Sequence, residues 1–232
     1  MKNELIGIIC AMEKEANGII NAMDDKKAEI ISGVTFTKGK IYGKDCVVAV
    51  CGIGKVFAAL CAQSMILKYS PVLIINCGVA GGLDSRLGIC DIALSSSLVQ
   101  HDMDTSALGD PKGMISGINI VNIPCDSDAT ELLEKCAKEE GIKTLVGVIA
   151  SGDKFMSESS EKKNIVDTFG AIACEMEGAA VAQVCYVNNV RCCVMRAISD
   201  GGDDNASMDY PAFAKIAAEQ AVKVILKFFE SL

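Results

Sequence analysis

AIACEMEGAAVAQVCYVNNVRCCVMRAISDGGD, residues 171–203, predicts a strand, a helix and a second strand in succession. Side chains two residues apart in extended backbone point the same way, so Glu175 and Glu177 should share one face and Met176 the other. The unbroken apolar run of the second strand is typical of a strand covered on both faces. Asp200 stands where that run ends, and open α/β sheets bind ligands at the carboxyl ends of parallel strands. These carboxylates therefore mark a candidate site.

Strand and helix patterns alternate along the rest of the chain, which predicts a mostly parallel or mixed twisted sheet covered by helices on both faces. We therefore expect a three-layer α/β/α fold. No linker, repeat or break in composition divides the chain, so residues 1–232 are expected to form a single domain. The predicted helices are 13–23, 55–69, 127–141, 157–167 and 210–232, and the predicted strands lie within 5–12, 31–54, 72–83, 91–104 and 144–155.

Three segments without a regular pattern are predicted to be turns or loops. Residues 24–27 are all charged and predict a polar turn, and the glycines of 78–82 predict a loop at the end of a strand. Residues 105–117 show no periodicity and predict a long loop, and such loops are often lids or binding loops. Gly33, Gly39 and Gly43 are expected to separate strands, and Ser127 or Asp128 to cap the helix that follows.

Composition excludes several functions. The net charge of −8 argues against nucleic acid as a partner, because nucleic-acid binding needs a basic surface. No apolar run is long enough to span a bilayer, and no signal-peptide pattern opens the chain, so we expect no membrane association. Most of the twelve cysteines lie in apolar segments, where a thiol behaves as a small hydrophobe. With no CxxC pair and one histidine, His101, no metal site is expected, and the thiols suit a reducing cytoplasm.

Five stretches place a glycine or a carboxylate at the end of an apolar strand. In a doubly covered sheet such strand ends converge on one cleft, although each stretch alone could be a tight turn or close backbone packing. GIGK does not match the phosphate loop GxxxxGK[ST], and GVAGG does not match GxGxxG, which argues against nucleoside triphosphates and dinucleotides. The stretches are AMEKE (11–15), CGIGK (51–55), NCGVAGG (76–82), ASGDKFM (150–156) and the carboxylate set described above.

The chain resembles the 5′-methylthioadenosine/S-adenosylhomocysteine nucleosidases, within the nucleoside phosphorylase superfamily. The resemblance covers nearly the whole chain and rests on GIICAMEKE, CGIGKVFAA, INCGVAGGL, CDIALSS followed by HDMD, ASGDKF, CEMEGAAVAQVC and VMRAISD. It implies a nucleoside phosphorylase-like fold and hydrolysis of 5′-methylthioadenosine and/or S-adenosylhomocysteine to adenine and the 5′-thio-substituted ribose. It implies no cofactor, and the family is typically homodimeric, for which the apolar 57–69 segment could supply an interface.

The resemblance also assigns roles to individual residues. Asp200 looks like the general acid at adenine N7, oriented by Ser199, and Glu15 aligns with the residue that holds the attacking water. Inverting glycoside cleavage needs an acid on one face and a water-activating carboxylate on the other, which agrees with this pair. The substrate-binding candidates are Glu177 for the ribose hydroxyls, Met176 beneath the sugar, Glu175 beside them, Met156 and Phe155 for adenine, Val79 near the nucleophile, and Ile53, Tyr210 and Phe213 for the alkylthio end.

Simpler explanations remain for the two main carboxylates. Asp200 could be a helix cap, and Glu15 could be a first-turn residue favoured by the helix dipole. The chain also departs from the family in two places. Residues 107–117 lack the aromatic side chains that many members use to cover the partner's 5′ pocket, leaving Leu108 and Met114 as apolar replacements. Val79 stands where the family often has serine.

Two alternative functions stay open. A nucleoside phosphorylase would need cations for phosphate, usually arginine, and the chain has only Arg86, Arg191 and Arg196. Glu15 would also repel phosphate. A catalytically silent nucleoside-binding protein would be expected to have lost a carboxylate, yet Glu15, Glu177 and Asp200 are all present. Hydrolysis is therefore the favoured function.

Overall fold

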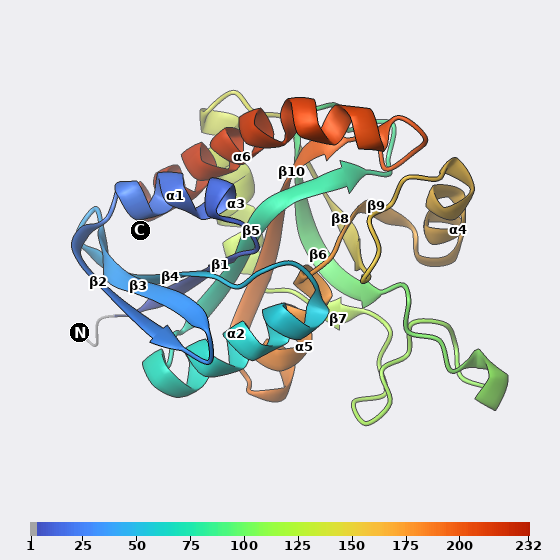
Figure 1. The fold of residues 1–232 in the computed structure, drawn as a ribbon, viewed down its shortest axis with the longest axis horizontal. Helices are drawn as coiled ribbons and strands as arrows, with labels where there is room; N and C mark the ends of the chain where they lie inside the picture. Colours follow the sequence, from blue (N-terminus) through green and yellow to red (C-terminus); the bar gives the residue numbers. More distant parts are fainter. Residues whose placement is uncertain (1–3) are drawn as a thin grey trace.

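The computed structural model describes residues 4–232 as a mixed sheet with helices around it (Figure 1). The strands are β1 (Ile6–Cys10), β2 (Asp24–Ile31), β3 (Val34–Ile41), β4 (Lys44–Val50), β5 (Leu73–Gly82), β6 (Ile92–Gln100), β7 (Ile123–Pro124), β8 (Thr144–Ser151), β9 (Ala171–Glu175) and β10 (Arg191–Asp200). The helices are α1 (Glu13–Asn21), α2 (Lys55–Tyr69), the 3₁₀ helix η1 (Ser106–Leu108), α3 (Ser127–Glu139), α4 (Ser159–Phe169), α5 (Gly178–Val187) and α6 (Ala206–Glu230).

Strand β5 is the centre of the sheet, and all ten of its residues are buried. It pairs in parallel with β1 and β10 and, at its carboxyl end, antiparallel with β9. Because β10 also pairs with β6, the strands β10, β6, β8, β9 and β5 close into a ring. Strands β1, β4, β3 and β2 extend the sheet away from this ring. The carboxyl ends of β1, β5 and β10 consequently meet at one edge.

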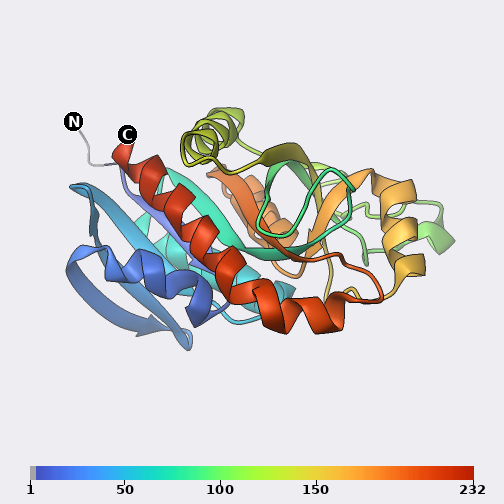
Figure 2. The same cartoon turned by 90° about the horizontal axis from the view of Figure 1, so that it is seen from above.

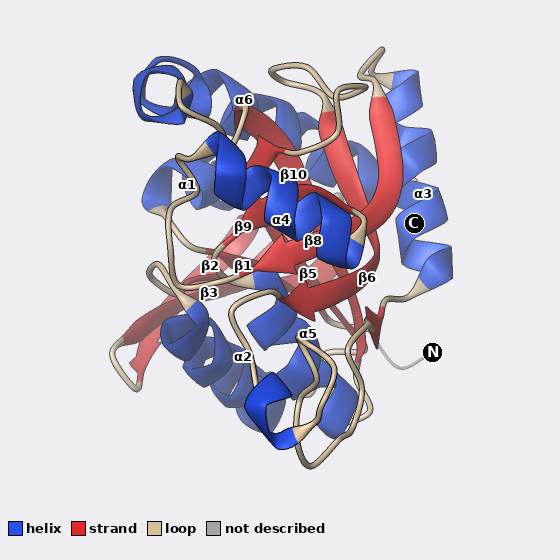
Figure 3. Cartoon of the chain, turned by 90° about the vertical axis from the view of Figure 1, so that its right-hand side faces the viewer, coloured by secondary structure: helices blue, strands red, loops and turns tan. Residues whose placement is uncertain are grey.

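Helices cover both faces of the sheet, as the three-layer prediction required (Figure 3). Helices α1, α3 and α6 pack on one face, and Figure 2 shows α6 lying across the molecule. Helices α2 and α5 pack together on the opposite face. Burying two separate apolar layers is the main stabilising contribution expected of such a fold.

Some local predictions were wrong. Residues 24–27 are not a turn but the start of β2, an exposed edge strand rich in charged side chains, and such charges protect an edge from pairing with other chains. The glycines of 78–82 do not form a loop, because β5 continues through Gly82. Gly39 lies inside β3 instead of separating two strands.

Two helix starts also differ from prediction. The cap of α3 is Asp126, whose Oδ1 accepts a hydrogen bond from the Ala129 N–H at 2.9 Å, and not Ser127 or Asp128. Helix α6 begins at Ala206, so Pro211 lies inside it instead of at its start. The proline removes one intrahelical N–H donor, but the helix continues to Glu230.

All twelve cysteines are free thiols. In the part of the chain that the structure describes, no helix has the length and apolar character needed to cross a membrane.

Candidate active site

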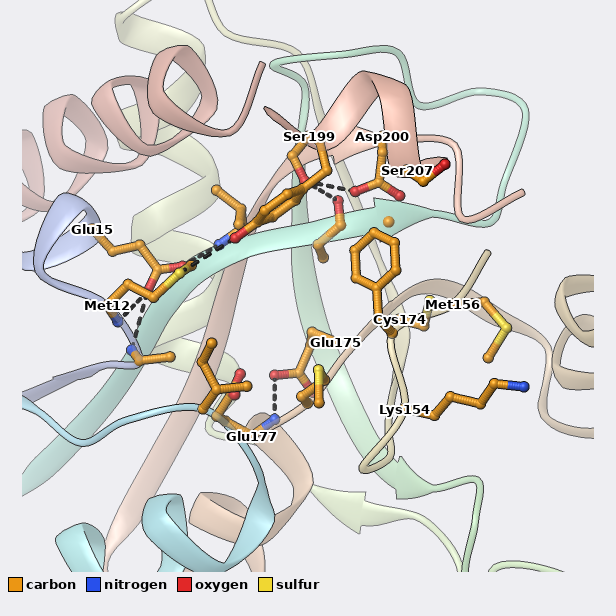
Figure 4. Close-up of a pocket in the computed structure, with 18 residues that line it drawn as sticks. Met12, Glu15, Lys154, Met156, Cys174, Glu175, Glu177, Ser199, Asp200 and Ser207 are labelled. Carbon is orange, nitrogen blue, oxygen red and sulfur yellow. Dashed lines mark hydrogen bonds between the residues drawn. The ribbon is translucent and has the colours of Figure 1, made fainter. Parts of the chain in front are cut away.

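A cavity of about 430 Å³ lies where the ends of β1, β5, β9 and β10 meet (Figure 4). Eleven of the twelve predicted site residues line it. The exception is Phe213, which lies further along α6, outside the cavity, and is 36% exposed. The other lining residues, which the sequence did not single out, are Ala11, Met12, Ala80, Gly81, Lys154, Cys174 and Ser207.

Glu15 reaches the cavity from the first turn of α1, and its carboxylate is bound by backbone donors. Oε2 accepts hydrogen bonds from the N–H groups of Ala11 at 3.0 Å and Met12 at 2.9 Å, and Oε1 accepts one from Val79 at 3.0 Å. Burial raises the pKa of Glu15, while the positive charge of Arg196 and these N–H donors lower it in part. Val79 contributes its backbone N–H here, a donor that serine or valine can supply equally.

Asp200 is the last residue of β10 and faces the cavity from another side. Its Oδ1 accepts a hydrogen bond from the Gly202 N–H at 2.9 Å, and Oδ2 is bound by the Ser199 hydroxyl at 2.8 Å. Burial raises the pKa of Asp200, and these two donors lower it only in part. A carboxyl group in this environment can keep a proton closer to neutral pH than an exposed aspartate can.

The glycines of β5 make room for both carboxylates. A Cβ atom on Gly78 would lie 2.7 Å from Oε1 of Glu15, and one on Gly81 would lie 2.9 Å from Oδ1 of Asp200. Both distances are too short for a real side chain, so the two carboxylates rest directly on the backbone of the strand. The NCGVAGG stretch is therefore explained by close approach of functional side chains and not by a flexible loop.

Glu175, at the end of β9, lines the cavity but is held by the protein itself. Its Oε2 accepts hydrogen bonds from the N–H groups of Glu177 at 3.0 Å and Gly178 at 2.7 Å, at the start of α5. The same oxygen forms an ion pair with Arg196, and Oε1 is bound by the hydroxyl of Ser151. With these acceptor sites in use, Glu175 is better suited to fixing its neighbours than to binding a ligand.

Arg196 is a charged residue in the middle of the buried strand β10, and its role was not predicted. Its side chain is 2% exposed, pairs with Glu175 and lies 3.9 Å from Oε2 of Glu177. It also donates to the carbonyl of Asn76 at 3.0 Å and to the side-chain oxygen of Asn76. Burial alone would lower the pKa of Arg196, but the carboxylates of Glu175, Glu177 and Glu15 raise it. The sequence does contain a signal for this role, because a single arginine within an apolar strand is expected to be buried. A buried charge requires partners of opposite sign.

Glu177 is the residue before α5, where β9 has already ended, so Glu175 and Glu177 do not share one strand face as predicted. Met176 lines the cavity as well, instead of pointing away from it. Oε1 of Glu177 accepts a hydrogen bond from the Gly54 N–H at 2.8 Å. Burial and the negative charge of Glu175 raise the pKa of Glu177 to about 7, although Arg196 lowers it.

The start of α2 connects two parts of the cavity wall. Next to the Gly54 N–H that binds Glu177, the N–H of Lys55 donates to Oδ1 of Asp153 at 2.8 Å. Asp153 precedes the lining residues 154–156. Its N–H donates to Asp102 at 2.9 Å, and the Lys55 ammonium pairs with Asp102 at 2.5 Å. The consecutive N–H groups of Gly54 and Lys55 thereby hold the Glu177 carboxylate and the segment that begins at Asp153.

An apolar wall completes the cavity. The rings of Phe155 and Tyr210 meet edge to face with centroids 5.5 Å apart, and the Tyr210 hydroxyl lies 3.3 Å from Sδ of Met12. Such a wall suits a flat, partly apolar ligand. Within residues 4–232, no group of three His, Cys, Asp or Glu side chains is placed to hold a metal ion.

Glu15 and Asp200 approach the cavity from different sides: Figure 4 shows Glu15 on the left and Asp200 at the upper right. Burial raises the pKa of both carboxyls, but Asp200 is bound by one N–H and one hydroxyl, whereas Glu15 is bound by three backbone N–H groups. This arrangement can supply a proton to a leaving group on one side and position a water molecule on the other.

Comparisons with known proteins agree on the relatives of this chain. A sequence model described as the Phosphorylase superfamily matches residues 5–230. A 5′-methylthioadenosine/S-adenosylhomocysteine nucleosidase of Shewanella sediminis is 35% identical over 98% of this chain and 99% of that protein. An aminodeoxyfutalosine nucleosidase of Helicobacter pylori is 38% identical over 98% of this chain and 99% of that protein.

Solved structures of such nucleosidases have the same fold. The Helicobacter pylori 5′-methylthioadenosine/S-adenosylhomocysteine nucleosidase, in complex with a pyrrolopyrimidine–pyrrolidine ligand, superposes with a TM-score of 0.95 at 37% identity, with 100% of both chains covered. The Neisseria meningitidis nucleosidase in complex with methylthio-immucillin-A also gives 0.95, at 31% identity, over 99% of this chain and 100% of that one.

Proposed function

The chain belongs to the 5′-methylthioadenosine/S-adenosylhomocysteine nucleosidases of the phosphorylase superfamily, and we propose that it hydrolyses the N-glycosidic bond of 5′-methylthioadenosine and/or S-adenosylhomocysteine. The products are adenine and the 5′-thio-substituted ribose. One observation carries the proposal: a single cavity contains Asp200, whose pKa is raised by burial, and Glu15, whose carboxylate is bound by three backbone N–H groups.

We infer that Asp200 donates a proton to N7 of adenine. Protonation makes adenine a neutral leaving group while positive charge develops on the ribose. The hydroxyl of Ser199, 2.8 Å from Oδ2, and the N–H of Gly202 fix the orientation of the carboxyl group. Phe155 and Met156 are assigned to the adenine, by stacking and through the backbone respectively.

Glu15 is assigned to the attacking water. Its three N–H donors stabilise the ionised form that a general base requires and hold both oxygens in place. Glu177 is assigned to the ribose hydroxyls, with Met176 beneath the sugar. The negative charges of Glu15 and Glu177 also suit a cationic transition state. Ile53 and Tyr210 then remain for the 5′ substituent, whereas Phe213, outside the cavity, is given no role.

The arginines argue against phosphate as the nucleophile. Arg86 pairs with Asp84, Arg191 with Asp126, and Arg196 with Glu175. These are the only three arginines in the sequence, and none lines the cavity. A phosphate-binding site would need such a cation free of carboxylate partners.

We expect the purified protein to release adenine from 5′-methylthioadenosine in phosphate-free buffer, and added phosphate should not increase the rate. Adenine release and the sugar product can be followed by chromatography. A requirement for phosphate, with formation of a ribose 1-phosphate, would show a phosphorylase instead. Binding without any adenine release would favour the silent binding protein.

We expect kcat/KM to fall as the pH drops below about 7, the pKa of Glu177 in the free protein. Protonated Glu177 has no negative charge to stabilise the positive charge on the ribose, and it accepts hydrogen bonds from the ribose hydroxyls less well. In the opposite direction, activity should fall at high pH because Asp200 must be protonated to act as the acid. The pH profile of Glu177→Gln should retain the high-pH decline and lose the decline near 7. An unchanged low-pH decline in this variant would assign it to another group.

We also infer a homodimer in which α2 contributes to the interface. The supporting observation is its outer surface, where Val56 is 79% and Leu67 is 76% exposed and Phe57 is half-exposed.

The free cysteines support a cytoplasmic location, and the net charge of −8 supports the expectation of no nucleic-acid partner. One sheet runs through the chain, which supports a single domain over residues 1–232.

A further inference from the structure

Lys14 is an exposed residue of α1 whose ammonium group lies against the wall of the cavity. Its Nζ is 3.1 Å from the hydroxyl oxygen of Tyr210 and 4.5 Å from the centroid of that ring. The same hydroxyl is 3.3 Å from Sδ of Met12. Because Tyr210 and Met12 both line the cavity, Lys14 places a positive charge at its margin without forming part of its floor.

Within the described part of the chain, the charge of Lys14 has no partner of opposite sign. Among residues 4–232 it forms no ion pair, and only Tyr210 accepts a hydrogen bond from it. The other lysine at the cavity, Lys154, is paired with Glu161 at 2.6 Å and Glu158 at 3.8 Å. An ammonium group has three N–H donors, so Lys14 retains donors for a ligand while the ring of Tyr210 restrains it.

Figure 4 shows Met12 and Glu15 at one end of the cavity and Met156 and Lys154 at the other. Under the proposed function, Met156 marks the adenine end. Lys14 therefore lies at the end that receives the 5′ carbon of the sugar.

The cavity is unfavourable to anions in general. Glu15, Glu175 and Glu177 all line it, and the chain carries a net charge of −8. A substituent bearing a carboxylate would be repelled unless that group sat beside a cation. Lys14 supplies a cation at the 5′ end, and the Tyr210 hydroxyl beside it supplies a second possible donor.

We propose that Lys14, restrained by Tyr210, is a specificity-determining residue that favours 5′-alkylthio substituents ending in a carboxylate, and hence S-adenosylhomocysteine over 5′-methylthioadenosine. The proposal rests on the proposed function, which assigns the 5′ substituent to Ile53 and Tyr210, and the Tyr210 hydroxyl is the group that Lys14 contacts. S-adenosylhomocysteine ends in an α-amino acid, whose carboxylate can accept hydrogen bonds from Lys14 and Tyr210. The methyl group of 5′-methylthioadenosine gains nothing from either donor.

The test compares three nucleosides: 5′-methylthioadenosine, S-adenosylhomocysteine, and the 5′-(3-aminopropylthio) analogue, which keeps the length and the amine but lacks the carboxylate. In Lys14→Met, which keeps an unbranched side chain without the charge, kcat/KM for S-adenosylhomocysteine relative to 5′-methylthioadenosine should fall about fivefold, the upper range for an exposed ion pair. In the same variant, kcat/KM for the aminopropyl analogue relative to 5′-methylthioadenosine should not fall. High salt should reduce the wild-type preference.

Two control variants separate this charge effect from a general loss of activity. Lys14→Arg keeps the positive charge and should keep the preference. Lys163→Met removes an exposed lysine of α4, paired with Asp167, and should change no ratio. An unchanged ratio in Lys14→Met, or an equal fall for all three nucleosides, would overturn the proposal. If the wild type cleaves none of them, the proposed function fails, and the same ratios measured as Kd decide whether Lys14 selects the carboxylate.

Discussion

Replacing Asp200 by asparagine is expected to lower kcat for adenine release by about 10³-fold, within the range for loss of a general acid. Asparagine has the same shape as aspartate, can accept the hydrogen bond from Gly202 and can still bond to the Ser199 hydroxyl. It cannot transfer a proton to adenine. The fold and the affinity for the nucleoside should therefore survive while the chemistry does not.

The measurement is a single-turnover rate of adenine release, together with equilibrium binding of 5′-methylthioadenosine and a thermal unfolding curve. Asp167→Asn is a suitable control, because Asp167 is an exposed residue of α4 remote from the cavity lining. A variant at Asp200 that keeps more than a tenth of the wild-type rate would remove this residue as the acid. Loss of binding together with loss of rate would point to a structural role instead.

The helices and strands that build the cavity were largely predictable, because the sequence patterns that indicate them are local. Helix α2 begins and ends at the predicted residues, since its helical spacing follows the GIG turn and stops at Ser70 and Pro71. The apolar strands were predictable for a similar reason, and parallel strands bring their carboxyl ends together. The placement of Glu15 and Asp200 in one cavity follows from the order of β1, β5 and β10.

Other features depend on tertiary context that the sequence does not display. Strand β2 is exposed and polar, so it lacks the alternation by which strands are recognised. The glycines of β5 resemble a loop until Glu15 and Asp200 are seen to pack on them. Likewise, the resemblance suggested that Glu175 assists with the substrate, whereas its hydrogen bonds and its ion pair with Arg196 lie within the protein.

Replacing Arg196 by methionine is expected to lower the free energy of unfolding by about 3–5 kcal/mol, the usual cost of removing one partner of a buried ion pair. The loss should be large because both side chains are 2% exposed, so water cannot replace the guanidinium. Glu177, whose carboxylate lies 3.9 Å from Arg196, would lose the nearby positive charge as well. Urea unfolding at constant pH measures the change.

Two comparisons make this prediction specific. Arg191→Met breaks a pair with Asp126 in which the arginine is 49% exposed, and should cost no more than about 1 kcal/mol because half of the arginine already lies in water and Asp126 keeps its hydrogen bond from the Ala129 N–H. The double variant Glu175→Gln/Arg196→Met leaves no charge at the Glu175 position, so it should recover much of the stability that Arg196→Met loses. The glutamine oxygen can still accept from the N–H groups of Glu177 and Gly178. If the double variant is as unstable as the sum of the two single variants, an unpaired buried charge is not the cause, and Arg196 stabilises the sheet through its packing and its bonds to Asn76 instead.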